Sequence, residues 1–504
     1  MSATSTTRRA EATIAPNGRR DSVAVIDIGS NSLRLVVYDG VRRAARTLLN
    51  EKVLCGLGRG LSETGRLNPD GVELARVNLQ RFVALAQAIG VVRLDVLATA
   101  AMRDAADGKD FAAEIERRFG VRVRVLAGAE EGRYSALGVL SGIPEATGVA
   151  GDLGGGSVEL VPIAKGRAGV AATLPIGPLR LAAVADDEKR VRDTIDRQLA
   201  TVPWLTRNAD GNFYAVGGAW RALARLHMEQ AQYPLHIIQE YTLARAEAEK
   251  YLDLVARQSR KSLERISTVS RKRLEVVPLA ARLLLRLLRR VEPRAVVFSA
   301  AGLREGHLYS LLDAAEQRSD PLVAACTEAA QLNPRFGASG EALYAWTGPL
   351  FPKEPPSRQR LRRATAMLSD IAWDEHPDYR AEQALRHALY MPVTGVNHAE
   401  RAFIALALHA RYGGRATVDL AAPLELLDED ALAAARIVGL ALRLGYTIMG
   451  GVPGLLGGVT LGLGDGAVVL NFAPSSTGRF GETVQRRLDA LARAMGRSAE
   501  LRGV

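Results

Sequence analysis

Short runs of β-forming residues alternate with stretches of helical spacing up to about residue 312. Residues 22–29 and 33–40 are predicted to form two strands around a tight turn, and residues 91–100 a third strand. Residues 67–90 begin with the helix-start signal Asn-Pro-Asp and continue with apolar residues at helical period. The same order of strands and helices starts again at about residue 145. This alternation predicts an α/β architecture in two blocks.

The pattern changes after residue 312. Residues 313–449 are rich in Ala, Leu and Arg at helical period, which predicts a mostly helical domain. Residues 450–504 carry a hairpin pattern, GVTLGLGDGAVVLNF, followed by a helical pattern, ETVQRRLDALARAMG, which predicts a small α+β segment. We expect the Pro-rich residues 350–360 to form a surface loop.

Composition is that of a soluble protein with several domains. The chain has 504 residues, 48% of them hydrophobic and 24% charged. Two distant cysteines, Cys55 and Cys326, provide neither a disulfide framework nor metal-ligand spacing, which indicates a reducing cytoplasm. No run is predicted to span a membrane, because the apolar residues 279–290 are interrupted by arginines.

The positions at which these patterns begin and end predict the domain boundaries. Residues 1–21 carry Ser, Thr and Arg without an apolar run and are expected to be a disordered basic tail. We expect two α/β domains at 22–144 and 145–312, the helical domain at 313–449 and the small segment at 450–504. A net charge of +11 suits a polyanionic partner, although many cytosolic proteins are mildly basic without any binding role.

One ten-residue phrase occurs twice, as DIGSNSLRLV at 27–36 and DLGGGSVELV at 152–161. A strand that ends in Asp-x-Gly, followed by a turn of small residues, lets an anion approach the backbone N–H groups closely. The aspartate at the strand end repels phosphate but can hold Mg²⁺. A single Gly-Ser turn between strands is common, whereas two aligned copies predict two phosphate-binding turns that face each other across a cleft.

The two phrases resemble the phosphate motifs of the actin-like superfamily, which includes sugar kinases and heat-shock chaperones, and AVGGAWRAL at 215–223 is similar to its third glycine motif. IDIGSNSLRLVV, LAGAEEGRYSALGV, GDLGGGSVEL and SAAGLREGHLY, in this order, resemble the exopolyphosphatase / guanosine pentaphosphate phosphohydrolase (Ppx/GppA) family. The resemblance covers residues 22–312 strongly and the remainder more loosely. It implies two ribonuclease H-like (actin-like) domains around a cleft, then a mostly helical degenerate HD-like domain and a small α+β tail.

The resemblance implies that Glu131 is the base that activates water. This residue lies in the first turn of a predicted helix, from which its carboxylate can point into the cleft. Its neighbour Glu130 cannot face the same point, because adjacent helical residues diverge by about 100°. The alternative is that both acids only stabilise the helix N-terminus.

The same resemblance implies a metal site. We expect Asp152 as a ligand and Glu159 as a second ligand that also assists the water, because the returning strand brings Glu159 back beside Asp152. Asp27 either holds the metal through water or only caps its turn. Arg34 takes the place of Glu159 in the first copy and is expected to bind phosphate from the opposite wall. For each of these residues the alternative is a surface charge on an edge strand.

Backbone and hydroxyl donors are expected to bind the phosphates, with Gly217 and Gly218 as a third contact surface; the two turns contribute Ser30, Asn31, Ser32, Gly154, Gly155, Gly156 and Ser157. Arg103 and Arg304 match family positions near the cleft and are expected either to bind phosphate or to form interdomain salt bridges. Where the family often has an acid after the serine of its last motif, this chain has Ala300, so any role of that acid is absent.

Two further segments carry alternatives. The basic stretch 271–290 is a candidate polyphosphate track, but a solvated amphipathic helix face is favoured. In the HD-like domain Ser369 stands where a metal-binding histidine is expected, so Asp370 lacks its partner. His376, His387 and His398 are not at i, i+4 spacing. We expect this domain to serve dimerisation and a long substrate channel rather than catalysis.

The leading function implied by the resemblance is a cytoplasmic exopolyphosphatase that removes terminal phosphate from inorganic polyphosphate with Mg²⁺, a monovalent cation such as K⁺ being left open. The same site suits guanosine pentaphosphate, which is the alternative substrate. A superfamily kinase and a non-catalytic sensor of guanosine penta- or tetraphosphate are further alternatives. The expected assembly is a homodimer, with neither a membrane nor a specific nucleic acid as partner.

Overall fold

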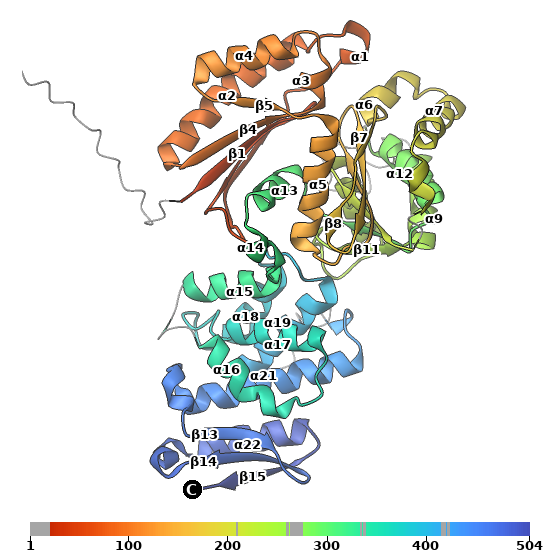
Figure 1. The fold of residues 1–504 in the computed structure, drawn as a ribbon. Coiled ribbons are helices and arrows are strands. Elements are labelled where there is room, and N and C mark those ends of the chain that lie inside the picture. The colour runs from red at the N-terminus through yellow and green to blue at the C-terminus, as the bar shows by residue number, and fades with distance from the viewer. Residues whose placement is uncertain are drawn as a thin grey trace, which may run out of the picture.

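The computed structural model describes residues 21–207, 210–258, 276–332, 339–414 and 424–503, with residues 262, 335 and 420 between these ranges. Two sheet-containing domains lie side by side, the helical domain follows below them, and a small sheet lies at the far end (Figure 1). Residues 1–20 of the basic tail predicted at 1–21 and residues 271–275 of the basic stretch lie outside the described residues.

The first domain is built on a five-stranded mixed sheet in the order β3-β2-β1-β4-β5. The predicted hairpin is present, since β1 and β2 are antiparallel, and β4 runs parallel to β1. Alternate side chains of β1 enter different cores, so Ile26 packs with α2 and α4 while Val25 packs with α13. The elements are β1 (Val23–Ile28), β2 (Leu33–Tyr38), β3 (Thr47–Val53), α1 (Leu61–Thr64), α2 (Pro69–Ile89), β4 (Arg93–Ala98), α3 (Ala100–Asp104), α4 (Gly108–Phe119) and β5 (Val123–Val125).

The second domain repeats this arrangement in a seven-stranded sheet, β11-β12-β10-β6-β7-β8, with β9 paired to β7. The hairpin β6–β7 and the parallel neighbour β10 correspond to β1–β2 and β4 of the first sheet. This duplication confirms the predicted pair of actin-like domains. The elements are β6 (Gly148–Leu153), β7 (Val158–Ala164), β8 (Arg167–Ala168), β9 (Ala172–Leu174), α6 (Pro178–Leu181), α7 (Glu188–Ala200), β10 (Asn212–Val216), α8 (Gly218–Gln230), β11 (Tyr241–Ala244), α9 (Arg245–Ala256), α12 (Val277–Val291) and β12 (Ala295–Phe298).

Two helices cross between the sheets, α5 (Gly128–Gly142) and α13 (Leu303–Ser310) (Figure 1). Although α5 precedes the second sheet in sequence, it covers a face of that sheet, and α13 covers a face of the first sheet. The helices cross closely because of glycines: a Cβ added at Gly306 would lie 1.7 Å from the Tyr134 carbonyl oxygen, and one at Gly138 would lie 2.3 Å from that of Gly302. Each domain therefore contributes one helix that packs against the sheet of the other domain.

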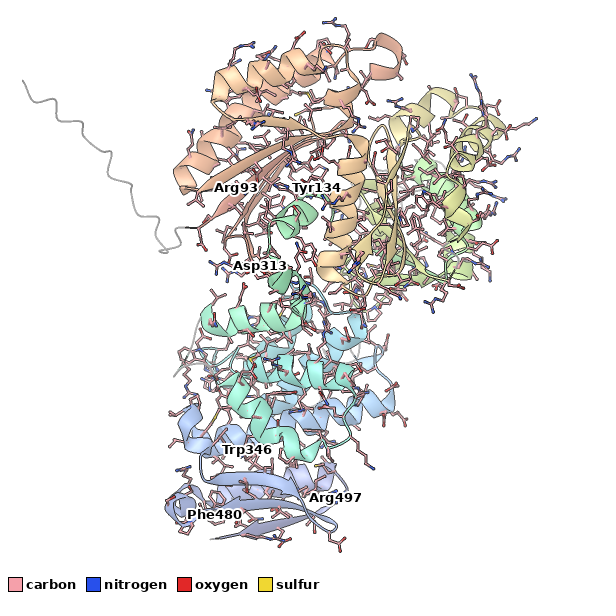
Figure 2. The ribbon with its side chains drawn as sticks, in the orientation of Figure 1. Arg93, Tyr134, Asp313, Trp346, Phe480 and Arg497 are labelled. Carbon is pink, nitrogen blue, oxygen red and sulfur yellow. The ribbon has the colours of Figure 1, made fainter. Side chains whose placement is uncertain are left out.

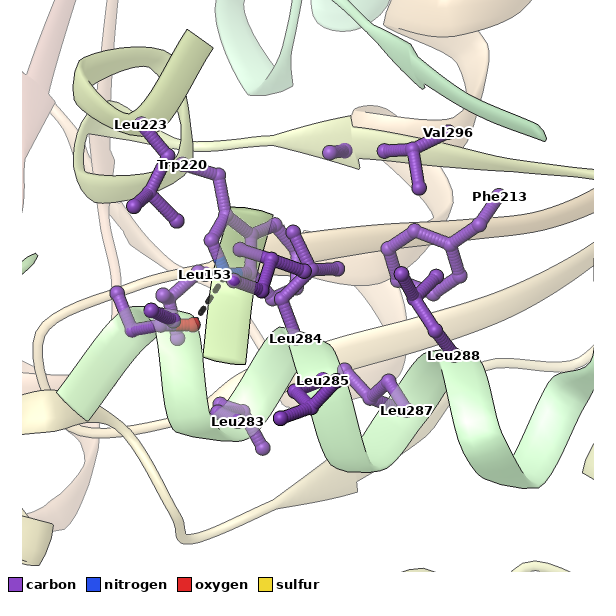
Figure 3. Packing of buried hydrophobic residues seen from close by; sticks show 14 of the residues in the cluster. Leu153, Phe213, Trp220, Leu223, Leu283, Leu284, Leu285, Leu287, Leu288 and Val296 are labelled. Carbon is purple, nitrogen blue, oxygen red and sulfur yellow. Dashed lines mark hydrogen bonds between the residues drawn. The ribbon is translucent and has the colours of Figure 1, made fainter. Parts of the chain in front are cut away.

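The basic stretch contributes the core helix α12. Its leucines pack against Phe213 and Trp220, and the Trp220 indole N–H donates to the Ala280 carbonyl at 3.1 Å (Figure 3). This core lies on the sheet face opposite to α5. Of its basic residues, Arg286 pairs with Asp196 at 2.6 Å and Arg289 is exposed. The helix is thus amphipathic, and it packs away from the face that α5 covers.

The helical domain and the terminal segment share one hydrophobic core. The Trp346 indole joins them by donating to the Val459 carbonyl at 2.8 Å (Figure 2). The helices are α14 (Ala314–Arg318), α15 (Pro321–Leu332), α16 (Gly340–Thr347), α17 (Pro356–Met367), α18 (Arg380–Tyr390), α19 (His398–Tyr412) and α21 (Glu429–Met449). The terminal segment contains β13 (Val459–Leu463), β14 (Ala467–Phe472), α22 (Glu482–Ala494) and β15 (Ser498–Arg502).

Two local predictions need correction. The loop predicted at 350–360 ends at Pro355, because α17 begins at Pro356, where the first helical turn tolerates a proline. The strand β15, which pairs in parallel with β14, was absent from the predicted elements. Among the described helices, α21 is long and apolar enough to cross a membrane, but 56% of its most apolar window is buried and it packs against α19.

Candidate active site

The two copies of the repeated phrase fold into the same turn, each at the end of the first hairpin of its sheet. The Gly29 N–H donates to the Ser32 carbonyl at 3.0 Å, and the Gly154 N–H donates to the Ser157 carbonyl at 3.0 Å. The register of the two hairpins is also equivalent, since Asp27 faces Arg34 and Asp152 faces Glu159. The sequence repeat is therefore a structural repeat down to single residues.

Neighbouring loops hold both turns by their carbonyl groups. The carbonyls of the two central residues accept hydrogen bonds of 2.8 to 3.2 Å: Ser30 from Gly58, Asn31 from Gly56, Gly155 from Leu179 and Gly156 from Gly177. Within the described part of the chain, the N–H groups of these four central residues donate to no protein acceptor. Backbone N–H groups left unpaired in such turns are suited to an anion.

The two turns meet at the interface of the domains. A Cβ added at Gly155 would lie 3.2 Å from the Cβ of Ser30, so the turns are in contact. The third glycine motif lies beside them, since a Cβ added at Gly217 would lie 2.5 Å from the Leu153 carbonyl oxygen. Gly218 begins α8 and is exposed. The structure thus brings together residues from all three glycine segments.

Glu131 lies in the first turn of α5 and faces inward, with 9% of its side chain exposed. Its Oε2 accepts from Arg103 Nη1 at 3.0 Å. Burial raises the pKa of Glu131 to about 7, against the lowering effect of Arg103. Glu130 points outward to Arg124 at 2.6 Å, as the 100° divergence predicts. A carboxyl with this pKa can accept a proton from water near neutral pH.

Asp152 and Glu159 lie on the sheet face that α5 covers. Ser135 of α5 donates its hydroxyl to Asp152, whose pKa is raised by burial against this bond and the charge of Arg221. Glu159 is 1% exposed, and no hydrogen bond of standard geometry reaches its carboxylate oxygens from the described residues, although the nearby Ser157 hydroxyl acts to lower its pKa. Burial and then the Glu131 charge raise the pKa of Glu159 well above its ordinary value. An unpartnered buried carboxylate is suited to a cation.

The described residues contain no group of three or more His, Cys, Asp or Glu side chains arranged to hold a metal ion. The predicted set of Asp27, Asp152 and Glu159 therefore does not form a metal cage. Asp27 instead accepts from Arg304 Nη1 at 3.2 Å, and burial raises its pKa against the charges of Arg304 and Arg34. The pair Asp152 and Glu159 still fits Mg²⁺, which is commonly held by one or two carboxylates together with waters and substrate phosphates.

Arg304 and Arg103 both lie in the site, and both form ion pairs. Arg304, in α13, forms an ion pair with Asp27 of the first domain, as in the interdomain salt bridge considered for this residue. Arg103 forms an ion pair with Glu131. Ser157 is buried with its hydroxyl unpartnered among the described residues, whereas Asn31 is exposed. Arg34 and Ser32 lie on the same hairpin at intermediate exposure.

Three site residues were missed by the sequence analysis. Arg221 donates to the carbonyls of Gly217 and Ala300 at 3.1 Å, and burial and the charge of Arg304 lower its pKa to about 10. Glu305 accepts from the Tyr38 hydroxyl at 3.2 Å, and Arg304 holds its pKa below the ordinary value although burial acts in the opposite direction. Ser135 is the third. The position of Arg221, four residues after Gly217 on a helix that starts at the turn, was the available signal.

In the helical domain the residues of the HD-like motif are separated. Asp370 pairs with Arg411 at 3.6 Å, and the Ser369 hydroxyl donates to its own helix turn at Ala366. His398 contacts Tyr233 and Gln239 of the second domain, while His376 and His387 lie near Asp378 and Glu375 respectively. An arginine thus occupies the place beside Asp370.

Two mixed sheets, each with a small-residue turn at the end of its first hairpin, define a pair of actin-like domains that share one site. The family model described as the Ppx/GppA phosphatase family matches residues 22–315, and one described as the exopolyphosphatase C-terminal matches residues 322–502. The chain belongs to the Ppx/GppA phosphatase family.

Curated relatives agree with this assignment over part of their length. Exopolyphosphatase 1 of Mycobacterium tuberculosis is 29% identical over 217 residues, which are 40% of this chain and 63% of that protein. The Mycobacterium leprae protein of the same name is 30% identical, with 40% and 64% covered. This chain therefore spans less than two thirds of these relatives. Retrograde regulation protein 2 of Saccharomyces cerevisiae is 26% identical, with 78% of this chain and 73% of that protein covered.

Solved structures confirm the fold. The Aquifex aeolicus member of the Ppx/GppA family is 28% identical with a TM-score of 0.50, covering 58% of this chain and 97% of that chain. An exopolyphosphatase from Cytophaga hutchinsonii is 24% identical with a TM-score of 0.53 and the same coverage. The predicted family and fold class are confirmed.

Proposed function

We propose that this protein is an exopolyphosphatase that hydrolyses the terminal phosphate of inorganic polyphosphate, with Glu131 as the base. The observation that carries the proposal is the meeting of two turns with unpaired N–H groups near a buried carboxyl of raised pKa. A polyphosphate chain needs several anion contacts in a row, and two adjoining turns supply them.

The chain's own residues carry out the reaction as follows. The N–H groups of the two turns bind successive phosphates, with Arg34 and Arg304 neutralising phosphate oxygens. Arg103 bonds Oε2 of Glu131 and thereby orients the carboxyl, and Glu131 takes the proton of the attacking water. The crossing of α5 and α13 holds Glu131 at the interface between the two domains.

Asp152 and Glu159 would hold Mg²⁺ in this proposal. Both lie on the cleft face of the second hairpin, and the orphaned oxygens of Glu159 are the observation that supports a cation there. When bound, Mg²⁺ supplies positive charge that stabilises the phosphate oxygens of the transition state. A monovalent cation such as K⁺ is a further candidate for the same acidic surroundings.

Guanosine pentaphosphate is the alternative substrate, since its 5′-triphosphate presents the same chemistry. A regulatory role is a second candidate, favoured by one observation: Retrograde regulation protein 2 of Saccharomyces cerevisiae aligns with 78% of this chain. We place the protein in the cytoplasm, where its two buried cysteines stay reduced, and expect a homodimer through the helical domain.

The proposal is tested by measuring phosphate release from long-chain polyphosphate and from guanosine pentaphosphate side by side. Glu131→Ala is expected to lower kcat by about 10²- to 10⁴-fold, the usual contribution of a general base. Glu130→Ala is the matched control and keeps wild-type activity, because this neighbour faces solvent. Full activity of Glu131→Ala would remove the proposed base, and no release from either substrate by the wild-type protein would support the regulator.

A further inference from the structure

A series of ion pairs leads from Glu131 to the second domain. Arg103, which bonds Glu131 through Nη1, also donates through Nε to Asp104 Oδ1 at 3.2 Å. The other carboxylate oxygen of Asp104 accepts from Arg180 Nη2 at 2.7 Å. Arg180 belongs to α6, which follows strand β9 of the second sheet, whereas Asp104 ends α3 of the first domain. The Asp104–Arg180 pair therefore joins the two domains.

Arg180 also lies beside the second glycine turn. The Leu179 N–H donates to the Gly155 carbonyl at 2.9 Å, so α6 is anchored to that turn. A Cβ added at Gly156 would lie 3.7 Å from Arg180 Nε. The guanidinium thus spans from the turn of one domain to an acid of the other.

We propose that Arg180 and Asp104 are positioning residues, which latch the two actin-like domains together over the substrate and set the place of Arg103 beside Glu131. The inference rests on the proposed hydrolase function and adds two residues to it. Domains around a cleft open and close by hinge motion. This ion pair is broken when α3 and α6 separate, so it forms only in the closed arrangement.

The Arg180–Asp104 ion pair can form and break repeatedly. The side chains of Arg180 and Asp104 are 37% and 31% exposed, so water can replace their contact without unfolding of either domain. The Arg103 guanidinium is shared between two carboxylates, because it donates hydrogen bonds to both Asp104 and Glu131. Closure of the domains and orientation of the base are thereby coupled through one arginine.

The kinetic test uses polyphosphate hydrolysis by the full-length protein. Arg180→Ala and Asp104→Ala are each expected to lower kcat about tenfold or more, the size of effect that misplacement of a reacting group produces. The double variant is expected to lose no more than either single variant, because both act through the same pair. Arg180→Lys is expected to recover part of the loss, since it keeps the charge. Arg192→Ala, a surface arginine of α7 that pairs with its neighbour Asp193, is the matched control.

A distance measurement tests the latch without activity. Spin labels at Lys109→Cys on α4 and Lys189→Cys on α7, both exposed, report the separation of the domains, while the native cysteines are buried. Arg180→Ala is expected to lengthen or broaden the distance distribution, and Arg192→Ala to leave it unchanged. Independent, additive kinetic losses, or an unchanged distribution in Arg180→Ala, would overturn the latch. Absence of turnover by the wild-type protein would instead overturn the proposed function and leave the distance test to decide on the latch.

Discussion

The first and second hairpins have the same backbone but opposite electrostatics. In the first, Asp27 faces Arg34 across the strands and is bonded by Arg304, so its charge is compensated by arginines. In the second, Asp152 faces another acid, Glu159, whose oxygens have no hydrogen-bond partner among the described residues. The same hairpin and small-residue turn thus occur twice, and one side-chain position distinguishes a hairpin whose aspartate faces an arginine from one whose aspartate faces a second acid.

Among substitutions within the two hairpins, the largest expected effect comes from changing this one position in each hairpin. Glu159→Gln removes the second carboxylate of the proposed Mg²⁺ pair and is expected to lower kcat about 100-fold and to raise the Mg²⁺ concentration needed for half-maximal rate. Arg34→Gln removes a charged donor to phosphate, worth about 1.5–3 kcal/mol, and is expected to raise KM roughly tenfold or more. Phosphate release at varied Mg²⁺ and polyphosphate concentrations separates the two effects.

Comparing Glu159→Gln with Arg34→Gln also defines the result that would contradict this prediction. Equal losses in the same kinetic parameter, with an unchanged Mg²⁺ requirement in Glu159→Gln, would show that the two hairpins act alike and that the charge difference has no functional consequence. Circular dichroism of both variants checks that each is folded, which matters most for Arg34→Gln because only Glu159→Gln keeps the side-chain length.

Sequence patterns predicted the strands, turns and helices that are determined by neighbouring residues in the chain. The strands and turns at 27–36 and 152–161 follow from period-two alternation and small residues. Helix geometry requires Glu130 and Glu131 to face different directions, and the family resemblance indicated Glu131 as the residue that faces inward. Residues that reach the site through tertiary packing had no such local cause. Glu305 enters from α13 because that helix crosses onto the first sheet, and Ser135 meets Asp152 because α5 covers the second sheet. Asp27 likewise accepts from Arg304, 277 positions away in the sequence, a contact that no local pattern indicates.

The buried acid Glu131, which lies near Asp152 of the second hairpin, also predicts how the free energy of unfolding depends on pH. Glu131 has a folded pKa of about 7 against an ordinary value of 4.5, so the folded state binds its proton more tightly than the unfolded state does. Its stabilising contribution is therefore full below about pH 4.5 and is lost as pH rises through 7. Between pH 5 and pH 8 the loss amounts to roughly 2–3 kcal/mol of unfolding free energy.

Guanidinium unfolding at pH 5 and pH 8, with a chelator present to exclude metal, measures this dependence. Glu131→Gln cannot ionise and is expected to show a smaller fall in stability than the wild-type protein, by roughly 2–3 kcal/mol. The control is Glu130→Gln, whose exposed carboxylate is paired with Arg124 and is expected to leave the wild-type dependence in place. Parallel curves for wild type and Glu131→Gln would contradict the raised pKa.

The smallest effect concerns the contact between the two turns, because the electrostatic difference matters only if the hairpins act on one ligand. Gly155→Ala places a Cβ 3.2 Å from the Cβ of Ser30 and 3.0 Å from Leu179 Cδ1, so one turn must shift by a few tenths of an ångström. Gly156→Ala meets only Arg180 Nε at 3.7 Å and is the matched control. We expect Gly155→Ala to lower kcat/KM for polyphosphate about tenfold, corresponding to about 1.4 kcal/mol, and Gly156→Ala to change it little. If both alanine variants keep wild-type kcat/KM, the spacing of the turns does not limit the reaction, and the two walls bind phosphate independently.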